Sequence, residues 1–158
     1  MTDEMKLDRA KKVYDTLCEA LEEHEWKYEK DEDELVIKCG AQGEDLPMDI
    51  NITVSVGRQM VLLLSHMPFA IAEDKRLELA VAVSIVNNRL VDGCFDYNIK
   101  TGYMVFRMTN SFLESTLGKE VFSYMLFCSC QTIDEYNDKF LMLAKGMLSL
   151  EQFIGNEG

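Results

Sequence analysis

The chain has 158 residues, of which 47% are hydrophobic, and its 28 acidic and 16 basic residues give a formal net charge of −12. Because a negative surface repels phosphate groups, we expect neither nucleic acid nor a membrane as a partner. The charge acts first on solubility, although a basic protein segment is compatible with it. The length is that of one domain, and we predict a single domain over residues 1–158.

Neither the N-terminal segment nor the cysteines predict export. The N-terminal MTDEMKLDRAKK has no apolar core of signal-peptide length, and the longest apolar run, MVLLL, is far shorter than the ~20 residues that span a bilayer. The cysteines are odd in number and dispersed: Cys18, Cys39, Cys94, Cys128 and Cys130. We therefore expect free thiols and a cytoplasmic protein.

The first half of the chain predicts one helix followed by strands. Apolar residues at helical spacing predict an amphipathic helix over about residues 4–24. The segment EWKYEKDEDELVIKC then alternates apolar and polar residues around an acidic turn, which indicates a hairpin. A strand follows in MDINITVSV, whose polar residues predict that one face of the sheet is wet there. The next strand, MVLLLSHM, is apolar on both faces and is expected to be central.

The second helix is predicted over about residues 72–90 and is apolar almost all round. Such a helix is covered on more than one side, either by another helix of the same chain or by a partner subunit. We expect a homodimer that uses part of this helix or the hairpin that follows it. The candidate surface consists of Leu79, Ala82, Val83, Val86 and Arg107.

A second hairpin is predicted around Lys100-Thr101-Gly102, with Gly102 in the left-handed conformation. On its second strand the charge of Arg107 has two interpretations, a salt bridge or a contact with a partner. A long helix is expected over about residues 119–145, and the Ser149–Gln152 spacing indicates that a short helix follows. The fold class is therefore α+β, with the order α-β-β-β-β-α-β-β-α and helices covering one face of an antiparallel sheet.

Motifs for catalysis, cofactors or metals are not found in the sequence. His24 and His66 have no carboxylate at a fixed local spacing, and Cys128 and Cys130 are too close in sequence to face each other on a helix. We therefore predict no catalytic, cofactor-binding or metal-binding residues. The ten methionines have two interpretations, core packing or an adaptable binding surface.

Two segments resemble the YbjN-like bacterial proteins. In VNNRLVDGCFDYNIKTGYMVFR the resemblance is carried by Asn88, Gly93, Phe95, Gly102, Val105 and Arg107. In IDEYNDKFLMLAKGMLSLEQ it is carried by Asp134, Tyr136, Gly146, Ser149 and Glu151. A proline that the family often has after the tyrosine is missing here. The resemblance implies a fold like that of type III secretion chaperones, which bind extended protein segments and commonly dimerise.

Members of this family are described as “putative sensory transduction regulators”, and the resemblance supplies no catalytic residues. The first hypothesis is a non-enzymatic cytoplasmic protein that acts through protein interactions or regulation. The second is a chaperone that binds an extended segment of a client protein at a strand edge or in an apolar groove. The third is an enzyme with a pocket around His66 or Cys94.

Overall fold

The computed structural model describes residues 1–157 and confirms the predicted α+β class. Six strands form one antiparallel sheet in the order β1-β2-β3-β4-β6-β5, so β4 is central as expected. The strands are β1 (Tyr28–Asp31), β2 (Val36–Gln42), β3 (Pro47–Ser55), β4 (Met60–His66), β5 (Cys94–Asn98) and β6 (Tyr103–Ser111). The helices are α1 (Asp3–Glu23), η1 (Glu73–Lys75), α2 (Arg76–Arg89), α3 (Lys119–Ala144) and α4 (Leu150–Glu157).

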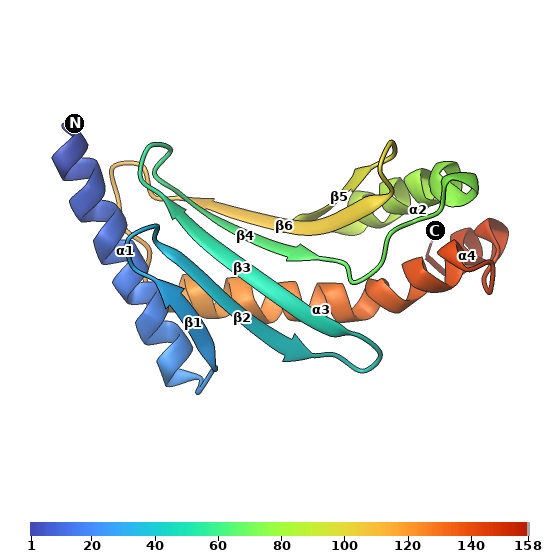
Figure 1. Cartoon of the computed structure of the whole chain (residues 1–158), viewed down its shortest axis with the longest axis horizontal. Coiled ribbons are helices and arrows are strands. Elements are labelled where there is room, and N and C mark those ends of the chain that lie inside the picture. Colours follow the sequence, from blue (N-terminus) through green and yellow to red (C-terminus); the bar gives the residue numbers. More distant parts are fainter. Residues whose placement is uncertain (158) are drawn as a thin grey trace.

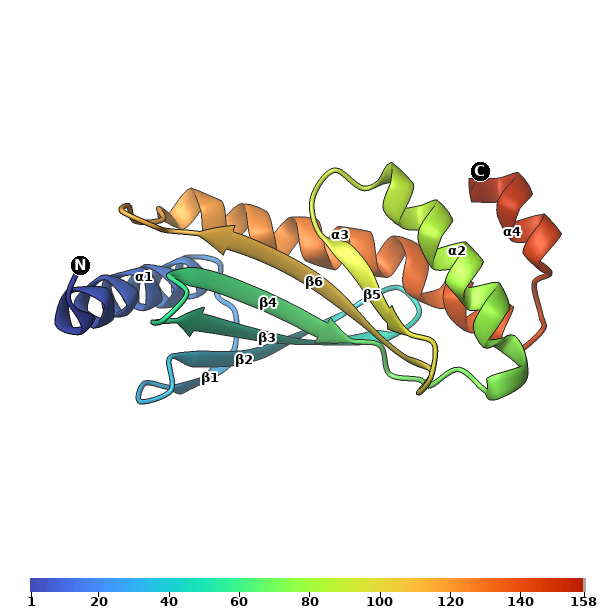
Figure 2. The same ribbon diagram turned by 90° about the horizontal axis from the view of Figure 1, so that it is seen from above.

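The helices lie at both ends of the sheet and along one of its faces. Helix α1 lies at one end, and α2 and α4 lie at the other (Figure 1). The long α3 runs along the side of the sheet from one end to the other (Figure 2). Burial follows the strand alternation: in β3, Met48, Ile50, Ile52 and Val54 are buried, whereas the residues between them are half-buried or exposed. One face of the sheet is therefore the core and the opposite face is uncovered.

Local signals in the sequence explain the ends of the helices. The Thr2 side chain accepts a hydrogen bond from Met5 N and caps α1. At the start of α4, Ser149 and Gln152 form the expected reciprocal capping box, with distances of 2.9 and 3.1 Å. Gly146 has a φ of 72° just after α3, a left-handed residue that ends the helix as predicted.

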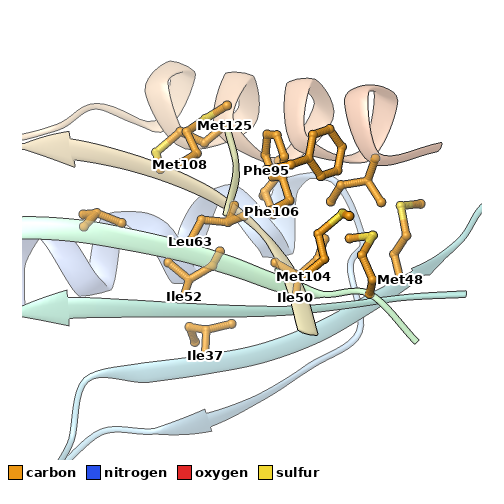
Figure 3. Close-up of a cluster of buried hydrophobic side chains, with 14 of the residues drawn as sticks. Ile37, Met48, Ile50, Ile52, Leu63, Phe95, Met104, Phe106, Met108 and Met125 are labelled. Carbon is orange, nitrogen blue, oxygen red and sulfur yellow. The ribbon is translucent and has the colours of Figure 1, made fainter. Parts of the chain in front are cut away.

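The core between the sheet and the helices contains most of the large apolar side chains. Figure 3 shows Ile50, Leu63 and Phe106 of the sheet on the side that faces α3. Behind them, Phe95, Tyr136, Phe140 and Phe153 form a chain of aromatic contacts with centroid distances of 5.0 to 6.4 Å. The buried methionines are Met48, Met67, Met104, Met108 and Met125. For these methionines core packing is therefore the correct interpretation.

Helix α2 is covered by the chain itself. It contacts α3, α4 and β5, and this explains why a partner subunit is not needed to bury its inner side. Leu79, Ala82 and Val86 have no exposed surface, and Val83 is 7% exposed. These four residues therefore pack inside the chain, against elements that include α3, α4 and β5, and their role as an interaction surface stays a prediction.

Candidate protein-interaction surface

Strand β4 places apolar side chains on both faces of the sheet, although helices cover only one. Val61 and Leu63 point into the core and are fully buried. Met60, Leu62 and Leu64 alternate with them, so they lie on the uncovered face, where they are half-buried. A one-sided antiparallel sheet usually has polar residues on its wet face, as β3 does here. The apolar outer residues of β4 are the exception, and they identify the candidate site.

The strand register brings further residues beside this apolar stripe. Leu62 pairs with Thr53 of β3 on one side and with Thr109 of β6 on the other. Leu64 pairs with Asn51 of β3 on one side and with Arg107 of β6 on the other. His66 pairs with Val105, so Val105 continues the apolar surface onto β6. We define the open face as the stripe Met60, Leu62, Leu64 and Val105 together with its polar border.

The open face is hollowed into a shallow trough of about 690 Å³. Its lining consists of Thr53, Ser55, Arg58, Met60, Leu62, Leu64, Asp96, Val105, Arg107 and Thr109. A second depression of about 640 Å³ shares Asp96 and Val105 with it and includes His66, Tyr97 and Tyr103. The two depressions therefore adjoin at Asp96 and Val105.

Charge in the trough differs from that of the chain. Arg58, Arg107 and Asp96 are its only ionisable lining residues, so two positive charges and one negative charge give +1, whereas the chain carries −12. Arg107 Nη1 lies 3.0 Å from Asp96 Oδ2, and both side chains are about half exposed. This confirms the salt-bridge interpretation of Arg107. In the part of the chain that the structure describes, the Arg58 guanidinium has no carboxylate partner.

The edges of the sheet are less accessible than its open face. On β5, the Asn87 side chain donates a hydrogen bond from Nδ2 to Phe95 O at 2.9 Å and accepts one from Phe95 N at 2.8 Å. Asn87 thus occupies the backbone N–H and C=O of Phe95, which an added strand would otherwise use. At the opposite edge β1 has only four residues, three of them exposed and charged. Short, charged edges resist pairing with another strand.

The sequence predicts some of these residues but not others. Its pattern indicates that β4 is apolar on both faces and central, but the pattern does not indicate that the outer face stays uncovered. Of the five predicted interaction residues, only Arg107 lies on the open face. The family resemblance includes Asn88, which is exposed. The neighbouring Asn87, which the resemblance does not include, is the residue that bonds to the backbone of β5. The usable signal was the contrast between the polar outer face of β3 and the apolar outer face of β4.

The other candidate residues are dispersed. His66 is exposed at the end of β4, while His24 contacts Ser123 Oγ at 2.9 Å beside α3. Cys94 Sγ lies 3.8 Å from Arg107 Nη2. Burial and the nearby Cys130 raise the pKa of the Cys39 thiol to about 12. Among residues 1–157, no three His, Cys, Asp or Glu side chains come together so that they could hold a metal ion.

These features define a one-sided α+β domain with an uncovered, partly apolar sheet face. The model of the YbjN family, described as “Putative bacterial sensory transduction regulator”, matches residues 14–142, and the chain belongs to this family. No curated protein sequence matches the chain.

Solved structures that share the fold include the following two. The crystal structure of YbjN from E. coli, described as a putative transcription regulator, has a TM-score of 0.56 and 15% identity, and the match covers 77% of this chain and 86% of that one. A chain of the HopA1–SchA chaperone–effector complex has a TM-score of 0.51 and 12% identity, with 78% and 91% covered. At these identities the similarity establishes the fold alone.

Within the described residues, every helix is too short or too polar to cross a membrane.

Proposed function

We propose that the chain is a non-enzymatic protein-interaction or regulatory domain of the cytoplasm that binds a protein partner through the open face. The observation that carries this proposal is the apolar outer side of β4, Met60, Leu62 and Leu64, on a sheet face that no helix covers. Apolar surface removed from water stabilises a complex by roughly 25 cal/mol per Å². Contiguous apolar surface of this kind typically marks an interaction site.

The family and the fold support the same proposal. The YbjN family carries a regulator description, and one structural neighbour belongs to a chaperone–effector complex. That neighbour supports the alternative in which the chain is a chaperone for a client protein. The two hydrogen bonds between the Asn87 side chain and the Phe95 backbone argue against the addition of a strand at β5. A client is therefore expected on the open face.

Affinity capture from the native cell with quantitative mass spectrometry tests the proposal. The test variant combines Leu62→Glu and Leu64→Glu, which place two charges in the trough. The control is Val91→Glu, because Val91 is 97% exposed in the loop after α2 and accepts the same change away from the open face. Circular dichroism and thermal melting verify that all three proteins fold.

We expect at least one protein to be retained by the wild type and by Val91→Glu and lost from the double variant. If folded samples of all three retain the same proteins, the open face is not the binding surface. If the double variant does not fold, the single variant Leu64→Ser takes its place, because it adds no charge to the open face. Its retained proteins are then compared with those of the wild type and of Val91→Glu.

A homodimer is a second candidate property, and one observation favours it. Leu77 and Val81 lie one turn apart on the outer side of α2 and are 75% and 43% exposed. They replace the buried residues of the same helix as the proposed dimer contact. Light scattering at micromolar concentration should give the mass of a dimer for the wild type and of a monomer for Leu77→Glu. A monomeric wild type would remove this candidate.

A further inference from the structure

We infer that the occupant of the open face is an amphipathic helix of a partner protein, with acidic residues flanking its apolar stripe. This inference rests on the proposed function, since it names the kind of segment that the open face binds. Three properties of the face support it: the direction of its backbone hydrogen bonds, the width of its trough and its charge.

The backbone of the sheet offers nothing to a segment that lies on its face. Hydrogen bonds of an antiparallel sheet run within the plane between neighbouring strands, and β4 is paired on both sides, with β3 and β6. A bound segment must therefore satisfy its own backbone N–H and C=O groups as it leaves water. A helix does so internally, whereas an extended segment does not.

The width of the trough fits one helix. Strands are spaced about 4.8 Å apart, so β3, β4 and β6 together span roughly 10 Å, close to the ~10–12 Å diameter of a helix with its side chains. Thr53, Ser55 and Thr109 border the stripe with hydroxyl groups. A second sheet packed on this face would also cover Asp49 of β3, and burying an unpaired carboxylate is costly.

The length of the stripe sets the spacing of the partner's anchors. Met60 and Leu64 are four residues apart, which corresponds to about 13 Å along a strand. A helix covers that distance in roughly nine residues, or two and a half turns. Apolar residues at positions i, i+3 or i+4, and i+7 of the partner helix would contact the whole stripe.

The local charge of the trough favours acidic residues at the ends of the partner helix. Arg58 and Arg107 lie in the trough, and Arg58 is exposed without a carboxylate partner among the described residues. Acidic residues at either end of a bound helix could pair with them.

Panning a displayed library of random 16-residue peptides against the full chain tests this inference. We expect the enriched peptides to have apolar residues at helical spacing and Asp or Glu near both ends. Their binding should be abolished by the combined Leu62→Glu and Leu64→Glu change. Arg58→Glu should weaken it about fivefold, because an exposed ion pair contributes modestly and the reversal adds repulsion. Lys11→Glu, the same change on exposed α1, should leave binding unchanged.

Each other result overturns the inference. Enriched peptides that alternate with period two, or that carry basic flanks, would show a different kind of occupant while the proposed open-face function still stands. Peptides that bind the double variant as well as the wild type, or no enrichment at all, would show that the open face does not accept a helix. The capture experiment then decides separately whether the open face binds any native protein.

Discussion

Asn87 of helix α2 and Phe95 of strand β5 are joined by two hydrogen bonds, of 2.9 and 2.8 Å, between the side-chain amide and the backbone. The amide of Asn87 thus acts like a residue of a neighbouring strand and ends the sheet at β5. Since Phe95 is also in the aromatic core, the same pair fixes α2 against the sheet. This closure leaves the open face as the accessible part of the sheet.

Replacing Asn87 with alanine should destabilise the protein. The substitution leaves the N–H and C=O of Phe95 without their partner, and we expect a loss of about 1–3 kcal/mol in the free energy of unfolding. Urea denaturation measures this loss, and hydrogen exchange should show that the Phe95 amide exchanges faster. Asn88→Ala is the matched control, because Asn88 is exposed. Equal stability of the two variants would contradict the role of Asn87.

Gly102 should not tolerate a side chain. Its φ is 78°, and a methyl group there would collide with the carbonyl oxygen of Ile71. The left-handed backbone alone costs about 1–2 kcal/mol for alanine, and the collision adds to it. Gly57→Ala is the control, since a methyl group at Gly57 meets no atom within 4 Å. Thermal melting should show a clear decrease for Gly102→Ala, and a decrease of the same size for Gly57→Ala would argue against this explanation.

The thiol of Cys39 should be nearly inert in the folded protein. Burial and the nearby Cys130 raise its pKa to about 12, so little reactive thiolate exists at pH 8. We expect iodoacetamide to modify Cys39 at least about a hundredfold more slowly in the native protein than in guanidinium chloride. Mass spectrometry of peptides measures both rates. Rapid modification of the native protein would show that Cys39 is accessible.

Asp138 should make the stability depend on pH. Burial, and secondarily the charge of Asp45, raise the pKa of this carboxyl above its usual range. The folded state therefore binds the proton more tightly than the unfolded state, and this group lowers stability as pH rises from the unfolded pKa through the folded pKa. Its full penalty remains above the folded pKa and is absent below the unfolded one.

Asp138→Asn removes that penalty, so it should raise the melting temperature at pH 7 and have little effect at pH 3. Differential scanning calorimetry of both proteins at the two pH values provides the comparison. Glu135→Gln, which removes a charge from an exposed position of the same helix, is the control. A stabilisation by Asp138→Asn that is as large at pH 3 as at pH 7 would contradict this assignment.

Local patterns in the sequence were sufficient for the elements and their ends. The period-two alternation of MDINITVSV predicted β3, and its inner residues Met48 to Val54 are the buried ones. Gly102 and the Ser149–Gln152 pair were predicted for the conformations that they have. These predictions succeeded because turns, caps and strand alternation depend on residues that are close in sequence.

The candidate site required the arrangement of distant segments. The sequence alone determined that β4 is apolar on both faces and that α2 is apolar nearly all round. It did not determine which of these apolar surfaces the chain itself would cover, because that depends on where α3 and α4 pack. The tertiary structure decided that α3, α4 and β5 bury Leu79 and Val86, while Leu62 and Leu64 remain uncovered. The physical reason is that an apolar surface is covered by segments that are distant in the sequence. The local pattern of a strand or helix does not indicate which distant segment will contact it.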